Sequence, residues 1–122
     1  MDKQIKISLT RESVSQGDDV FAPNKKVIYF SLNRSIADLT TEVLAIHYLA
    51  NIFGDRATWI MKNEQTKIAV IAQQWTNAKF LIDENLAIDN LKKSGSYIHI
   101  HFDYLAQQNP STVYENLIAD KN

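Results

Sequence analysis

The chain has 122 residues and a net charge of −1, because 13 Lys and Arg residues stand against 14 Asp and Glu residues. This balance, without a basic stripe, argues against binding of nucleic acid through its phosphates. The absence of cysteine excludes disulfides, thiolate metal sites and a cysteine nucleophile.

The first predicted strand is Gln4–Arg11, where Ile5, Ile7 and Leu9 alternate with polar residues. Residues 12–25 hold turn signals and predict an unusually long connection between two strands. Hairpin loops usually have about 2–5 residues, and loops longer than about 12 residues tend to be functional or mobile. Lys26–Leu32 is rich in Val, Ile, Tyr and Phe and predicts a second strand. We expect the two strands to pair as a hairpin.

A helix is expected to open at Ser35, because Asp38 follows three residues later as a short relative of the capping box. Gly54 is expected to end this helix. Its apolar stripe consists of Ile36, Leu39, Val43, Ile46 and Ala50.

Shorter elements follow the helix. Two strands, Ala57–Lys62 and Lys67–Gln73, flank a polar turn. The second is apolar on both faces, which indicates a central strand or one covered on both sides. Ala78–Ile82 is expected to continue the sheet, and Leu86–Lys93 is expected to form a short helix.

The clearest strand is Ser96–Tyr104, which alternates strictly. A terminal helix follows, with Asn109 at its N-cap and Pro110 in its first turn. In the strand, one face carries Ile98, Ile100 and Phe102, and the other carries Tyr97, His99, His101 and Asp103.

The element order over about Gln4–Tyr104 resembles the ubiquitin-like β-grasp fold, an α+β mixed sheet, here with an added C-terminal helix. The resemblance implies that the first and last strands lie side by side in mid-sheet and that the long helix crosses one face. It implies an opposite face that carries Lys6, Ser8, His99, His101 and Asp103. The family places the strand at 68–72 at an edge, where the terminal helix is expected to cover it.

His99, His101 and Asp103 form the sharpest chemical pattern. Alternate residues of a strand lie about 6.5–7 Å apart on one face, so two imidazoles there can share a zinc ion if a third ligand joins them. The alternative is a polar, hydrogen-bonded sheet face. The chain has no Gly-X-Ser-X-Gly elbow and no Gly-rich phosphate loop. We expect no metal and no cofactor.

The remaining hypothesis is a surface that binds a protein partner. Asp18, Asp19 and Phe21 combine acid with an apolar group in the long connection, and Trp75 stands in a polar stretch. Aromatic residues are enriched at binding hot spots. The alternative is that Phe21 and Trp75 close the ends of a small core. Asp103 is the second acidic candidate for the partner site.

In size, in missing catalytic apparatus and in two segments, the chain also resembles small bacterial toxin-immunity proteins. The segments are Gly17-Asp18-Asp19 with Ala22-Pro23, and Ala57-Thr58-Trp59 with Gln73-Gln74-Trp75. The resemblance implies a non-enzymatic inhibitor that neutralises a toxin, such as a nuclease, by direct binding. The alternative is a small metal-dependent hydrolase that uses His99, His101 and Asp103.

The expected protein is a single domain over residues 1–122. Hydrophobic residues make up 45% and charged residues 22%, as in soluble globular proteins. No apolar run reaches the roughly 18 residues of a membrane helix, and the first residues lack the apolar core of a signal peptide. We therefore expect a cytoplasmic protein that binds no membrane and no nucleic acid.

Overall fold

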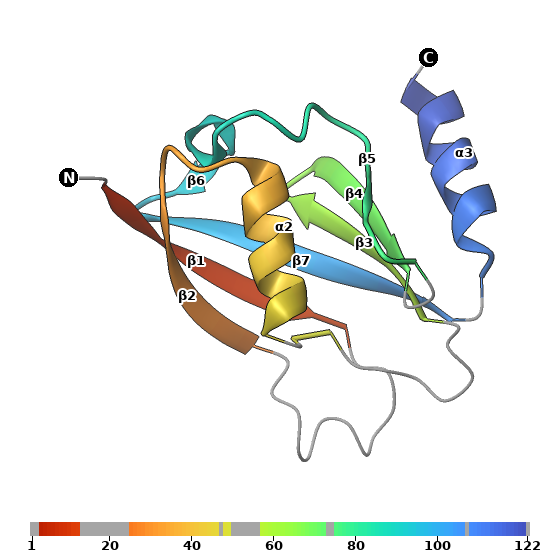
Figure 1. Cartoon of the computed structure of the whole chain (residues 1–122), viewed down its shortest axis with the longest axis horizontal. Coiled ribbons are helices and arrows are strands. Elements are labelled where there is room, and N and C mark those ends of the chain that lie inside the picture. Colours follow the sequence, from red (N-terminus) through yellow and green to blue (C-terminus); the bar gives the residue numbers. More distant parts are fainter. Residues whose placement is uncertain are drawn as a thin grey trace.

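The computed structural model of the chain describes residues 3–12, 25–46, 48–49, 57–72, 75–106 and 108–121. These residues form one mixed sheet of seven strands and two α-helices, so the expected α+β class is confirmed (Figure 1). The strands are β1 (Gln4–Arg11), β2 (Lys25–Ser31), β3 (Ala57–Asn63), β4 (Thr66–Ala72), β5 (Lys79–Phe80), β6 (Lys93–Ser94) and β7 (Tyr97–Ala106). The helices are α2 (Ile36–Ala45) and α3 (Pro110–Lys121).

The strands lie in the order β2-β1-β7-β3-β4-β5, and β6 pairs with β7. β1 runs antiparallel to β2 and parallel to β7, with Ile7 opposite Ile98. The hairpin and the mid-sheet pairing of the first and last long strands are thus both present as expected. On its other side β7 pairs antiparallel with β3.

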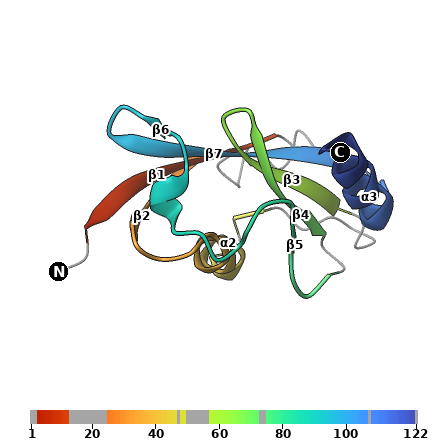
Figure 2. The same ribbon diagram turned by 90° about the horizontal axis from the view of Figure 1, so that it is seen from above.

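The main core lies between this sheet and α2, which crosses its inner face (Figure 2). Alternation in β1 and β7 places every second side chain on that face, as predicted. Complete burial of one such side chain stabilises the fold by roughly 1.5–3 kcal/mol. The fully buried members include Ile7, Leu9, Ile36, Leu39, Val43, Ile98, Ile100 and Phe102.

Helix α2 begins as predicted but ends early. The Ser35 hydroxyl accepts a hydrogen bond from the backbone N–H of Asp38 at 3.0 Å, and the Asp38 carboxylate accepts one from the Ser35 N–H at 3.4 Å. The prediction of a helix that runs to Gly54 is wrong, because α2 ends at Ala45. The N–H of Tyr48 donates back to the Val43 carbonyl, and the Tyr48 ring turns into the core against Phe102. Ala50 and Gly54 themselves lie outside the described residues.

The predicted short helix over Leu86–Lys93 is also wrong, since only one 3₁₀ turn, Ile88–Asn90, forms there. Beside its local bonds, this stretch donates backbone N–H groups to partners far away in the sequence. The Ile88 N–H donates to the Arg34 carbonyl at 2.8 Å, and the Lys92 N–H donates to the Asn63 side chain at 2.7 Å. Tertiary hydrogen bonds therefore override the local helix signal.

A second, smaller core lies on the outer face of the sheet. Val113 of α3 packs against Ile60 of β3 and Val70 of β4, which explains why the strand at 68–72 is apolar on both faces. The expectation that the terminal helix covers this strand is confirmed, although β5 also pairs with it, so β4 is not an edge strand. The Asn109 side chain accepts from the Thr112 N–H at 3.1 Å and caps α3 as predicted. No described helix is long and apolar enough to cross a membrane.

Candidate functional site

Among the described residues, helix α3 packs on the β3–β4 side of the outer sheet face and not over β2, β1 and β7 (Figures 1 and 2), where Ser8 is buried and its neighbours are exposed or partly exposed. Cross-strand pairs there bring aromatic and basic groups together: Tyr29 lies opposite Lys6, and the Lys6 Nζ is 5.7 Å from the centroid of the Tyr97 ring. Tyr29 is 64% exposed and Val27 is 40% exposed. We call this surface the open face; it comprises Lys6, Thr10, Val27, Tyr29, Tyr97, His99 and His101.

A chain of polar contacts crosses the open face toward β3. The Thr10 Oγ1 lies 2.8 Å from His99 Nε2 and 2.6 Å from His101 Nδ1. His101 Nε2 lies 3.3 Å from Asp103 Oδ1, and the Lys62 Nζ is 2.9 Å from Asp103 Oδ2. The pattern predicted for His99, His101 and Asp103 is therefore brought together, with Thr10 between the two imidazoles.

The direction of the hydrogen bonds in this chain follows from what each group can donate. A carboxylate only accepts, so the His101 Nε2 carries the proton that it shares with Asp103. In neutral His101 the Nδ1 is then an acceptor, and Thr10 donates to it. The single hydroxyl proton of Thr10 is thereby used, so Thr10 accepts from a protonated Nε2 of His99.

The electrostatics agree with a neutral His101. Burial lowers the pKa of its imidazole, and this effect outweighs the opposing attraction of the Asp103 carboxylate. Lys62 and His99 lower the pKa further, and Glu12 raises it. At a pH above 6.5, the usual pKa of histidine, His101 is therefore neutral, and its Nδ1 accepts the hydrogen bond that Thr10 donates.

The same geometry bears on metal binding. The imidazole nitrogens of His99 and His101 that face each other both contact Thr10, while Asp103 lies at the opposite nitrogen of His101. Within the part of the chain that the structure describes, no group of three His, Cys, Asp or Glu side chains is placed to hold a metal ion. Asp103 is engaged by Lys62 instead.

The residues predicted to bind a partner fall in three places. Asp18, Asp19 and Phe21 lie outside the described residues, in the segment that connects β1 to β2.

Trp75 packs against the second core, where the Lys79 Nζ is 4.8 Å from its ring centroid. The packing of Trp75 on the second core agrees with the alternative that this residue closes the end of a core. The Asp103 side chain is 26% exposed and already engaged by Lys62 and His101.

Sequence reasoning missed Thr10, Lys62 and Tyr29. The resemblance implied that the first and last strands lie side by side, but the parallel register that places Thr10 opposite His101 comes from the structure. Lys62 also lies opposite His101, on the other neighbouring strand. No family model, no curated protein and no solved structure matches this chain.

Proposed function

We propose that this protein is a non-enzymatic binding module whose partner is another protein that docks on the open face. The observation that carries the proposal is the exposure of Tyr29 and Val27 beside Lys6 and Tyr97. Tyrosine is a frequent hot-spot residue, since it combines a large apolar ring with a hydroxyl. An apolar centre with a charged margin is the usual composition of a protein interface.

The partner class that we propose is a toxin, which the protein would neutralise by direct binding, as bacterial immunity proteins do. Two features support this: the sequence resemblance, and the acidic Asp18–Asp19 pair in the segment that connects β1 and β2, the strands that carry Lys6, Val27 and Tyr29. A toxin that cuts nucleic acid presents basic groups to phosphate, and carboxylates placed opposite those groups favour fast and specific association.

The test takes the protein encoded by the neighbouring gene as the candidate partner. Val27→Asp and Tyr29→Ala are expected to weaken its binding at least about tenfold, because hot-spot residues contribute 1–2 kcal/mol or more. Leu86→Asp is the matched control, since Leu86 is 39% exposed but lies away from the open face. Calorimetric titration measures all three.

Equal affinity of the Val27 and Tyr29 variants and the wild type would remove the open face from the interface. The double variant Asp18→Lys, Asp19→Lys tests the segment between β1 and β2 in the same assay. We expect it to bind weakly, and we expect added salt to weaken wild-type binding.

A hydrolase is the second candidate, and one observation favours it. Asp103, His101 and Thr10 stand in the order carboxylate, imidazole, hydroxyl, which is the order needed to activate a hydroxyl nucleophile. Hydrolysis of p-nitrophenyl acetate that disappears in both Thr10→Val and His101→Gln would support this candidate over a binding module. Elemental analysis of the purified protein would test its metal-dependent form.

A further inference from the structure

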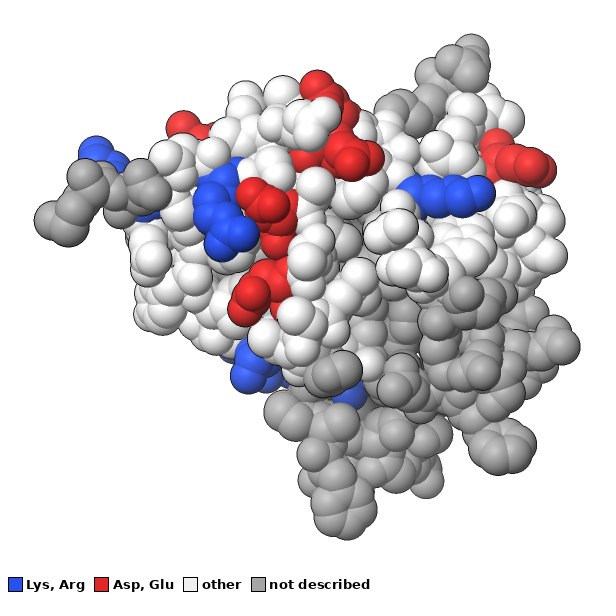
Figure 3. Space-filling model, viewed as in Figure 1, with Lys and Arg blue, Asp and Glu red and all other residues white. Residues whose placement is uncertain are grey.

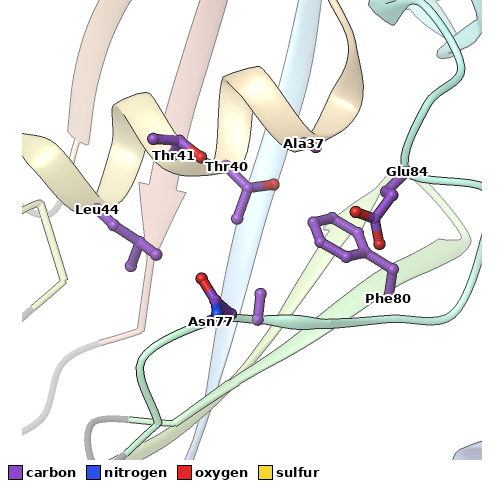
Figure 4. A pocket seen from close by; sticks show the side chains of 8 residues that line it. Ala37, Thr40, Thr41, Leu44, Asn77, Phe80 and Glu84 are labelled. Carbon is purple, nitrogen blue, oxygen red and sulfur yellow. The ribbon is translucent and has the colours of Figure 1, made fainter.

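A groove with a volume of about 320 Å³ lies on the opposite side of the sheet from the open face, between α2 and the segment around β5 (Figure 4). Thr40, Thr41 and Leu44 of α2 form one wall. Asn77, Phe80 and Glu84 form the other. This volume is at the lower end of the range for small-molecule sites.

The two ends of the groove differ in chemistry. Figure 4 shows the Glu84 carboxylate beside the Phe80 ring at one end, and Leu44 with Asn77 at the other. The lining also includes two small residues, Ala37 and Ala78, which leave room for a ligand. A ligand that fits has one polar head and a short apolar tail.

The charge of the groove favours a cationic head. Glu84 is the one charged residue in its lining, and it forms no ion pair with any described residue. The aromatic face of Phe80 attracts cations as well. Figure 3, which shows this side of the molecule, has acidic side chains gathered over α2 and the neighbouring chain.

The groups that would attract an anion are already occupied. A helix N-terminus offers free N–H donors to anions, but at the start of α2 the Ile36 N–H donates to the Leu86 carbonyl and the Ala37 N–H to the Glu84 carbonyl, both at 2.9 Å. The Thr40 hydroxyl donates to the Ile36 carbonyl at 3.0 Å. An anionic ligand would therefore meet the Glu84 carboxylate, and the donors left to it in the lining are the neutral side chains of Thr41 and Asn77.

We propose that this groove binds the ammonium group of a small primary amine. The ammonium pairs with the Glu84 carboxylate on the face of the Phe80 ring, and the alkyl chain lies along the groove toward Leu44. The inference does not rest on the proposed function, because the groove and the open face lie on opposite sides of the sheet. The same ammonium chemistry is available from a free amine or from a lysine side chain.

The test is a titration of the ¹⁵N-labelled protein with n-butylammonium, followed by NMR. Shifts are expected at groove residues such as Thr41, Asn77 and Glu84, with a dissociation constant of about millimolar for so small a ligand. Glu84→Gln is expected to weaken binding about tenfold, as loss of a charge-assisted hydrogen bond does. Glu42→Gln removes the same charge from the solvent side of α2 and is expected to leave binding unchanged.

Two further ligands complete the test. Uncharged n-butanol is expected not to bind. Nα-acetyl-lysine methylamide presents the same ammonium on a peptide, and tighter binding of this ligand would assign the source to a lysine side chain. The proposal is overturned if neither ammonium ligand shifts the groove resonances, or if Glu84→Gln binds n-butylammonium as well as the wild type does.

Discussion

Replacement of Asn63 by alanine is expected to destabilise the protein strongly, although Asn63 is the last residue of β3 and stands next to a turn. The side chain is 2% exposed and holds three backbone groups. Its Nδ2 donates to the carbonyls of Lys92 and His99 at 3.0 and 3.1 Å, and its Oδ1 accepts from the Lys92 N–H at 2.7 Å. The turn after β3 is thereby fastened to the chain that enters β7.

The magnitude follows from these three bonds. Each hydrogen bond contributes roughly 0.5–1.5 kcal/mol net, and orphaned buried groups add a desolvation cost. Asn63→Ala is therefore expected to lower the free energy of unfolding by about 3 kcal/mol. For a domain of this size that corresponds to a melting temperature about 10 °C lower.

Urea denaturation followed by circular dichroism measures this change as a shift of the unfolding midpoint, with the denaturant dependence (the m-value) unchanged. Asn85→Ala is the matched control, because Asn85 is exposed and is expected to change stability by less than about 0.5 kcal/mol. If Asn63→Ala were as stable as Asn85→Ala, the buried clamp would contribute nothing, and the reasoning would fail.

Further predictions concern the two faces and the second core. Ile100→Asp is expected to unfold the protein, because it buries a charge, whereas His99→Ala is expected to retain the fold. If thermal melts showed His99→Ala to be the less stable variant, the assignment of the buried and the outer face of β7 would be reversed. Because burial lowers the pKa of folded His101, the unfolded chain holds that proton more tightly. Stability is expected to fall as the pH drops below about 6.5, and His101→Gln should flatten this slope; parallel slopes would contradict it. Val113→Asp is expected to detach α3 and increase binding of the dye ANS, which an unchanged signal would exclude. Chelator is expected to leave the melting temperature unchanged, and a downward shift would reveal a bound metal.

The sheet core was predictable from the sequence because it depends on local alternation. The burial of Ile98, Ile100 and Phe102 follows from their spacing, and the start of α2 follows from the Ser35 cap. Both signals lie within a few residues of the feature they predict.

Other features depended on partners far away in the sequence. The end of α2 is set by the entry of Tyr48 into the core. The absence of the predicted helix over Leu86–Lys93 is set by backbone bonds to Leu32 and Arg34 and by the bond to Asn63. The contact of Thr10 with both histidines arises only when β1 and β7 pair. The sequence placed His99 and His101 on one face but contained no local sign of the group between them.

The pairing of β1 with β7 also has a kinetic consequence. Lys6 of the first strand pairs with Tyr97, so a central ladder of the sheet joins segments about ninety residues apart. Closing such a loop costs entropy before any contact rewards it, and domains rich in long-range pairs fold in milliseconds to seconds. During synthesis β1 and β2 emerge long before β7, so the edge of β1 that pairs with β7 stays unpaired until β7 has left the ribosome. The central ladder of the sheet therefore forms late, and the nascent chain carries an unpaired strand edge for much of its synthesis.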